Sequence, residues 1–114
     1  MRLPQILTVS LSGEIDLDGV NEIADMVFRL THRGGGHVRL VLDVSQVTHV
    51  DYRGMGVLAA RARLFRKAGG DIKWVGASSY LESLLKAAGV YLAFSFYPNE
   101  DAAREAFRPF PAVA

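Results

Sequence analysis

The sequence predicts an α/β fold, a mixed and mostly parallel β-sheet packed with about four helices in the order ββαβαβαβα. After the opening segment, β-rich segments alternate along the chain with amphipathic helical segments. Glycine pairs or capping residues mark most of the borders between them. Strands that alternate with helices imply parallel strands joined by right-handed crossovers, so the helices should cover the sheet.

The opening is predicted to be a short hairpin. Residues 6–11 alternate between apolar and hydroxyl side chains, Ser12 and Gly13 have the composition of a turn, and residues 14–16 resume the strand pattern. The first strand is therefore expected to pair antiparallel.

A core-facing helix is predicted next, with Asp16 or Asp18 as its N-terminal cap. One face of this helix is apolar, and it carries Val20, Ile23, Ala24, Val27 and Leu30. The glycines at 34–36 are interpreted as a connector after the helix. Residues 38–44 then predict a mostly buried central strand, because five of the seven are apolar.

The second half repeats the strand and helix pattern. A helix after residue 54 has apolar residues at spacings of three and four, namely Met55, Leu58, Ala62 and Phe65. Gly69 and Gly70 end it, and residues 71–76 alternate like a strand. Ser79 and Glu82 have the spacing of a capping box at the start of a third helix.

The C-terminal part is predicted to hold one more strand and one more helix. Residues 94–97 form a short β-rich run, and Asn99 has the position of a cap for the last helix. Pro109 and Pro111 are expected to end regular structure. An exposed aromatic residue in this part would favour a weak homodimer, which is left open.

Composition limits the class of protein. The 114 residues suit one domain over 1–114, with an ordered core of about residues 5–108. Thirteen basic and twelve acidic residues give a net charge of +1 without a basic run, so no nucleic-acid partner is expected. The absence of cysteine excludes disulfides and thiolate metal sites. No apolar run suits a membrane span or a secretory signal, so a cytoplasmic protein without membrane insertion is expected.

The strongest candidate site is the corner, which we define as residues 51–57. An aspartate followed by two glycines and an apolar helical run is typical of a strand-to-helix junction, with Asp51 placed to accept hydrogen bonds from the first free amides. Helix N-termini favour negative charge, and small glycines let another chain approach closely. The partner-binding residues predicted here are Asp51, Tyr52, Arg53, Gly54, Met55, Gly56 and Val57.

Several fragments in this order resemble the STAS domain of bacterial anti-sigma factor antagonists. Residues 11–16 resemble the family's opening Gly-Glu-aliphatic-Asp, and residues 40–43 its central strand. Val50-Asp51 with residues 54–57 resemble its Asp-Ser-Ser/Thr-Gly-aliphatic-Gly loop, and residues 68–70 precede the next strand as in the family. The resemblance spans nearly the whole chain and implies the STAS fold.

The resemblance also implies a phosphorylation site, from which this sequence departs. In the family, the residue after the loop aspartate is usually a serine or threonine phosphorylated by a kinase-like anti-sigma factor, and the added charge disrupts binding. Here that position is Tyr52, followed by Arg53. We favour an unregulated or differently regulated loop aromatic at this position. Phosphorylation of Tyr52 itself, and a binding hot spot formed by Tyr52 and Arg53, are the alternatives.

Other candidate sites have simpler structural explanations. The carboxylates Glu14, Asp16, Asp43 and Asp51 could gather at one sheet edge and hold Mg²⁺, but capping and loop roles account for each. The three histidines lack metal-ligand spacing, and no base and nucleophile pair is evident. We therefore expect no metal, no cofactor and no catalytic residue. Arg61, Arg63, Arg66 and Lys67 are interpreted as a solvated helix face or the border of a partner site.

The predicted function is a non-enzymatic protein-interaction module that resembles an anti-sigma factor antagonist. Its expected partner is an anti-sigma factor or serine kinase-like protein, bound through the corner without the usual serine phosphoswitch. One alternative is a STAS subunit of a transporter or a stressosome-like assembly. Another is a module that binds a nucleotide or a small anion at the helix N-terminus.

Overall fold

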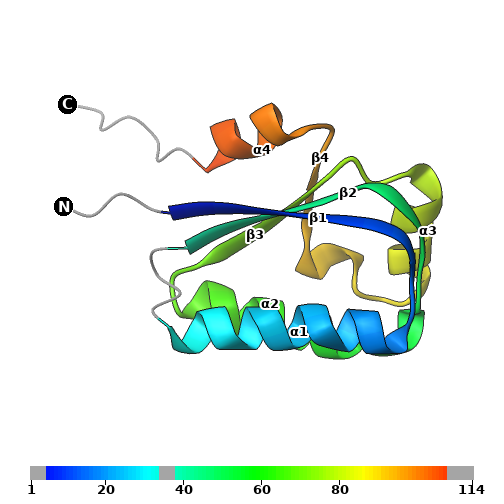
Figure 1. Ribbon diagram of the computed structural model, residues 1–114, viewed down its shortest axis with the longest axis horizontal. Helices are drawn as coiled ribbons and strands as arrows, with labels where there is room; N and C mark the ends of the chain where they lie inside the picture. Colours follow the sequence, from blue (N-terminus) through cyan, green and yellow to red (C-terminus); the bar gives the residue numbers. More distant parts are fainter. Residues whose placement is uncertain (1–4, 34–37, 108–114) are drawn as a thin grey trace.

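The computed structural model describes residues 5–33 and 38–107. Four strands and four helices alternate along these residues, with two short 3₁₀ turns between them (Figure 1). In chain order they are β1 (Gln5–Ile15), α1 (Leu17–His32), β2 (Val38–Val50), η2 (Tyr52–Gly54), α2 (Met55–Lys67), β3 (Asp71–Val75), α3 (Ser79–Ala87), η3 (Tyr91–Ala93), β4 (Ser95–Tyr97) and α4 (Glu100–Ala106). The predicted glycine connector at 34–36 and the prolines Pro109 and Pro111 lie outside the described residues.

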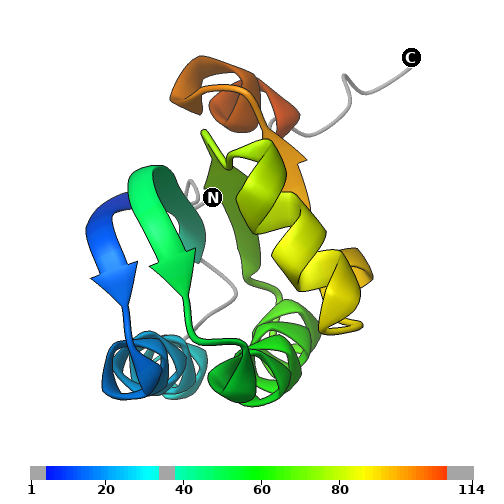
Figure 2. The same cartoon turned by 90° about the vertical axis from the view of Figure 1, so that its right-hand side faces the viewer.

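The sheet has the order β1-β2-β3-β4, and each described pair of neighbouring strands is parallel. Helices α1 and α2 lie side by side along one face, while α4 lies on the other (Figures 1 and 2). The main core lies between the sheet and the helices α1, α2 and α3, with Phe65, Leu40 and Leu85 fully buried. The predicted α/β fold class is therefore confirmed.

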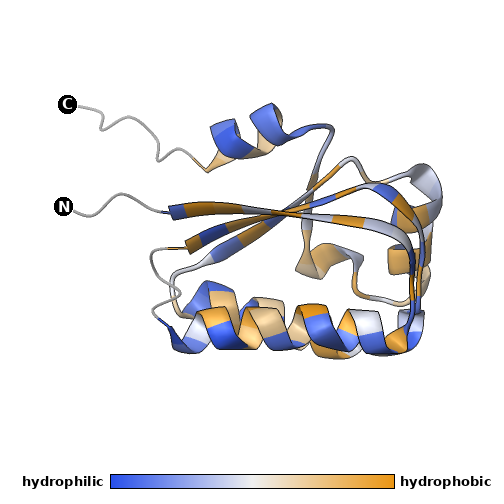
Figure 3. Cartoon of the chain, viewed as in Figure 1, coloured by the Kyte–Doolittle hydropathy of each residue, from blue (hydrophilic) through white to orange (hydrophobic). Residues whose placement is uncertain are grey.

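A smaller core lies under α4. It consists of Val41 and Val75 from the sheet and Ala103 from the helix, all of which are buried. In Figure 3 the hydrophobic part of α4 faces the sheet and its hydrophilic part faces away. This short helix is thus an amphipathic cover for one part of the second face.

The predicted opening hairpin is wrong. Residues 5–15 form one continuous strand that pairs parallel with β2, from Gln5 opposite Val38 to Ile15 opposite Val50. Gly13 does adopt a positive φ of 73°, which glycine tolerates without strain. Here that conformation kinks the strand without reversing the chain, because β2 supplies a parallel partner on both sides of the kink.

Strand β2 is longer than the predicted residues 38–44 and is irregular in its second half. Its register with β1 shifts between Ser10 and Ser12 and again between Gly13 and Glu14. At each shift β2 uses one residue more than β1, as in a β-bulge. Bulges bend and twist a strand, and β2 curves toward the layer of α1 and α2 before it reaches Asp51 (Figure 1).

The predicted caps are confirmed for two helices and corrected for a third. Asp16 Oδ1 accepts from the Gly19 amide at 2.8 Å, and Asn99 Oδ1 accepts from the Ala102 amide at 2.8 Å. For α3 the cap is Ser78, whose Oγ accepts from the Leu81 amide at 3.0 Å. Ser79 is already inside the helix, and Glu82 accepts a hydrogen bond from Tyr91, so the predicted capping box is wrong.

Replacing Ser78 with alanine is expected to lower the free energy of unfolding by about 1 kcal/mol, because an N-terminal amide of α3 loses its acceptor. Ser79→Ala is the matched control, since both serines are exposed but only Ser78 caps. Urea titration of the two variants measures the difference. A larger loss for Ser79→Ala would contradict this assignment of the cap.

Candidate functional site

The corner joins the end of β2 to the start of α2, beside the end of β1. The Asp51 amide donates to the Ile15 carbonyl at 2.9 Å, so the last residue of β1 holds the corner in place. Residues Tyr52–Gly54 form a 3₁₀ turn that leads directly into α2. The corner is therefore fixed by backbone hydrogen bonds at both ends.

Asp51 is the centre of the polar contacts at the corner. Its Oδ1 accepts from the Arg53 amide at 2.9 Å, as the sequence predicted for a cap. The Arg53 guanidinium also reaches back, with Nε at 3.0 Å from Oδ1 and Nη2 at 2.6 Å from Oδ2. This two-point ion pair is the strong form of a carboxylate–arginine contact, and it closes the turn.

The ion pair changes the acidity of Asp51. Hydrogen bonds from the Arg53 side chain, and then from its amide, lower the pKa of the Asp51 carboxyl from 3.8 to about 2. The same contact raises the pKa of Arg53. Both groups therefore stay charged at neutral pH, and the amide groups at the start of the turn face a resident carboxylate.

A carboxylate with a lowered folded-state pKa stabilises the fold above its unfolded pKa and loses this effect as the pH falls toward the folded value. In a pH titration followed by carbon-13 NMR, the midpoint for the Asp51 carboxyl is expected near pH 2, below the ordinary aspartate pKa of 3.8. Arg53→Ala should move the midpoint up toward the ordinary value, because the main cause of the shift is removed. An unchanged midpoint in that variant would disprove the role given to Arg53.

The predicted partner-binding residues divide into an exposed set and a buried set. Tyr52 is 62% exposed, Val57 is 49% exposed, and Arg53 and Gly56 are also on the surface. Gly54 and Met55 are buried, and Met55 is only 1% exposed. Because Gly54 and Met55 pack against the core, the part of the corner that a partner can reach in this structure is the exposed set.

Gly54 is buried because α1 passes directly over it. A Cβ at this position would lie 2.6 Å from Val20 Cγ1 and 3.3 Å from Leu17 Cδ1. The first of these distances is too short for two carbon atoms, so a side chain would push α1 and the corner apart. At Gly56 a Cβ would meet nothing within 4 Å.

These two glycines make a matched pair of substitutions. Gly54→Ala is expected to destabilise the protein by about 1 to 3 kcal/mol through overpacking. Gly56→Ala should be neutral or stabilise the helix by up to about 1 kcal/mol, since alanine has the higher helix propensity. Chemical unfolding of both variants measures this contrast, and equal effects would contradict the close packing of α1 on Gly54.

The structure adds residues from α3 that sequence reasoning missed. Tyr52 borders a shallow hollow of about 280 Å³ together with Leu84, Ala87 and Ala88. At the start of α3, the Tyr80 hydroxyl lies 2.7 Å from His49 Nδ1, and the two rings stack with centroids 5.9 Å apart. Tyr80 is 53% exposed. No local sequence signal could have found this pair, because its members are 31 residues apart.

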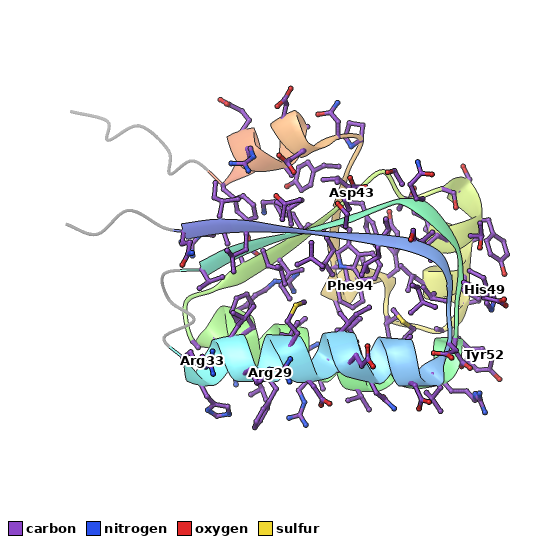
Figure 4. The ribbon with its side chains drawn as sticks, in the orientation of Figure 1. Arg29, Arg33, Asp43, His49, Tyr52 and Phe94 are labelled. Carbon is purple, nitrogen blue, oxygen red and sulfur yellow. The ribbon has the colours of Figure 1, made fainter. Side chains whose placement is uncertain are left out.

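We define the aromatic surface as Tyr52, His49 and Tyr80. His49 and Tyr52 project from the same end of the molecule, where β2 ends (Figure 4). Tyr80 reaches this end from α3 through its contact with His49. The corner and the start of α3 therefore form one exposed region with aromatic, cationic and small apolar groups.

Two of the other candidate carboxylates, Asp43 and Asp16, take structural roles. Asp43 accepts from the amide and hydroxyl of Ser45, at 3.0 and 2.7 Å, and Asp16 caps α1. Within residues 5–33 and 38–107, no group of three or more His, Cys, Asp or Glu side chains could hold a metal ion. His37 lies outside this range.

The basic residues of α2 are not one solvated face. Arg61 lies over the Phe28 ring at 4.5 Å from its centroid, and Arg66 donates to the Ala93 carbonyl and pairs with Asp71. Arg63 and Lys67 are exposed. These two lie in the second half of α2, away from the corner at its start.

The aromatic residues of the C-terminal half are mostly core. Trp74 is 2% exposed and packs against Phe94 and Phe96, with ring centroids 4.9 and 5.7 Å away. Tyr91 stacks on Phe96 at 4.9 Å. A homodimer through an exposed aromatic residue of this part therefore has no support from these side chains. No helix formed by the described residues is long and apolar enough to cross a bilayer.

Comparison with known families identifies the chain. The family description "STAS domain" matches residues 2–103, which is most of the sequence. The chain belongs to the STAS domain family. The resemblance inferred from the sequence fragments is therefore confirmed.

Solved STAS structures share this fold. One is the anti-sigma factor antagonist SpoIIAA, a Bacillus cell fate determinant. In its unphosphorylated form SpoIIAA is 18% identical in sequence to this chain, with a TM-score of 0.71, and the match covers 93% of this chain and 91% of SpoIIAA. An anti-sigma factor antagonist from Mycobacterium paratuberculosis has 26% identity and a TM-score of 0.71, and the match covers 91% of this chain and 86% of that protein. The murine anion transporter Slc26a9 has 20% identity and a TM-score of 0.74, covering 91% of this chain but 18% of the transporter.

Proposed function

We propose that this STAS domain is a non-enzymatic protein-interaction module that binds an anti-sigma factor, of the kinase-like class, through the exposed part of the corner. The observation that supports this most is the exposure of Tyr52 on a turn held by the Asp51–Arg53 ion pair. A large side chain on a rigid base loses little conformational entropy when it binds. Several structural relatives are anti-sigma factor antagonists, which supports an anti-sigma factor as the partner class.

The chemical composition of the surface suits a binding hot spot. Tyrosine and arginine are enriched among the residues that dominate interface energies. Tyr52 and Arg53 are adjacent here, and Val57 follows one helical turn later. Tyr52 also borders a hollow that it shares with Leu84 and Ala87 of α3. Tyr52 should therefore provide much of the affinity, while Arg53 selects a partner that offers an acceptor or an acidic group.

We propose that binding is not controlled by the serine phosphoswitch that the family resemblance implies. The residue after Asp51 is Tyr52, and the next is Arg53, so neither carries the serine or threonine hydroxyl of the family loop. Ser45 and Thr48 precede the corner on β2, and the Ser45 hydroxyl already donates to Asp43 at 2.7 Å. Regulation, where it occurs, should act through the partner or through another site.

The geometry argues against a nucleotide or small anion as the natural ligand of the corner. An anion at a helix N-terminus needs free amide groups and a site without another negative charge. Here the Asp51 carboxylate occupies that position, accepts from the Arg53 amide at 2.9 Å, and is already neutralised by the Arg53 guanidinium. A second anion would have to displace this ion pair.

Affinity purification from the native cell, with mass spectrometry of the bound proteins, tests the proposal. The wild type is expected to recover an anti-sigma factor, and Tyr52→Ala with Arg53→Ala should reduce the affinity for it at least tenfold, as for about 1.4 kcal/mol or more at a hot spot. Lys67→Ala, an exposed change at the other end of α2, is the control and should bind as the wild type does.

The same experiment distinguishes the alternatives. Recovery of transporter or stressosome-like components in place of an anti-sigma factor supports a STAS subunit of such an assembly, and wild-type binding by the double variant refutes the corner as the site. Mass spectrometry of the purified chain also reports phosphate on Tyr52, Ser45 or Thr48. Phosphate at Ser45 or Thr48 that abolishes binding would overturn the proposed lack of a serine or threonine switch, whereas phosphate at Tyr52 with the same effect would support the tyrosine alternative.

A further inference from the structure

The free edge of β1 is an unusual surface for a folded domain. Among the described strands, β1 pairs only with β2, and in Figure 2 it forms one rim of the sheet with no element beyond it. This edge strand has 11 residues, whereas β4 at the opposite edge has three. Folded proteins usually protect a long edge with charged residues, proline or a cover. Residues 6–13 of β1 contain neither charge nor proline.

An apolar groove runs beside this edge. It has a volume of about 430 Å³ and lies between β1 and α1. Its floor and walls include Val9, Leu11 and Ile15 from the strand and Ile23 and Met26 from the helix. All five side chains are only partly buried. A second strand added to the β1 edge would cover this groove and satisfy the unpaired backbone groups together.

We propose that the occupant is β1 of a second copy of this chain, paired antiparallel around a twofold axis at Val9. In that register Val9 faces Val9 of the other copy, and Leu7 faces Leu11 of the other copy, on the side of the sheet that α1 covers. On the other side Thr8 faces Ser10. In these central pairs apolar residues meet apolar residues and hydroxyls meet hydroxyls, both of which stabilise cross-strand pairs, while Ile6 faces Ser12 toward the end of the paired segment. The two sheets become one continuous sheet.

Charges on α1 agree with the same axis. Met26 and Val9 both border the groove, so the axis passes near the middle of α1. Glu22 and Asp25 precede Met26, whereas Arg29 follows it, and all three line the groove. A twofold axis reverses the helix direction, so Arg29 of each copy faces the acidic residues of its mate. Within a single chain, these three side chains form no ion pair with any of the described residues.

A pair of double variants tests this contact. Thr8→Lys with Ser10→Lys places like charges opposite one another across the axis, while Thr8→Glu with Ser10→Lys places opposite charges there. Both positions are exposed in the single chain, and the Thr8 side chain hydrogen-bonds to Glu100 of α4, so thermal melts must show that both double variants fold. The wild type is expected to sediment as a dimer at high micromolar concentration. The double-lysine variant should dimerise about tenfold or more weakly, and the Glu and Lys variant at least as tightly as the wild type.

A cysteine cross-link tests the register independently. The chain has no cysteine, so Val9→Cys introduces a single thiol that lies beside its mate only in the proposed register. Mild oxidation should give a covalent dimer for Val9→Cys but not for Ser12→Cys, which lies about 20 Å from its mate in that register. Thermal melts confirm that each variant is folded.

Three results would overturn the proposal. They are a wild type that stays monomeric, a double-lysine variant that dimerises as tightly as the wild type, or a cross-link only through Ser12→Cys. A monomeric wild type that gains a partner's strand at β1 would also reject the second copy as occupant. None of these outcomes bears on the corner, whose variants change other residues, so the two proposals fail independently.

Discussion

The parallel pairing of β1 with β2 is the interaction on which the rest of the structure depends. It runs from Gln5 opposite Val38 to Ile15 opposite Val50 and ends in the hydrogen bond from the Asp51 amide to the Ile15 carbonyl. Because both strands end at the same level, α1 and α2 begin next to one another and run side by side along one face. The corner, the buried Gly54 and the packing of α1 all follow from that common end point.

The extra residues of β2 have a specific effect on this arrangement. Without its two register shifts, β2 would end without the bend that brings Asp51 toward the layer of α1 and α2. Bulges of this kind redirect a strand near a functional site without changing its neighbours in the sheet. The irregular half of β2 therefore positions the corner, while its regular first half holds the core.

Local features of this chain were predictable because their causes are local. Asp16, Asp51 and Asn99 cap the turns that follow them, since a short oxygen-bearing side chain before an apolar helical run has few other roles. The apolar spacing of α1 and α2 likewise placed Val27 and Phe65 in the core. Each of these inferences needed only residues within a few positions of one another.

Features that depend on distant partners were not predictable. The composition of Ser12 and Gly13 suits a kink as well as a turn, and only β2, some thirty residues later, decides between them. Ser78 and Ser79 are chemically equal, and only the position at which α3 begins makes Ser78 the cap. The burial of Gly54 and Met55, and the contact of His49 with Tyr80, arise from packing between elements that the sequence does not place side by side.

The contact between Gly54 and Val20 has a consequence for how this domain can change during evolution. The two residues lie on different helical segments, and the Val20 side chain fills the space that Gly54 leaves by having no side chain. A Cβ on residue 54 would lie 2.6 Å from Val20 Cγ1. A larger residue at 54 therefore requires a smaller one at 20. Among relatives of this chain, the two positions should vary as a pair, whereas the exposed Tyr52 and Arg53 are free to diverge with the partner.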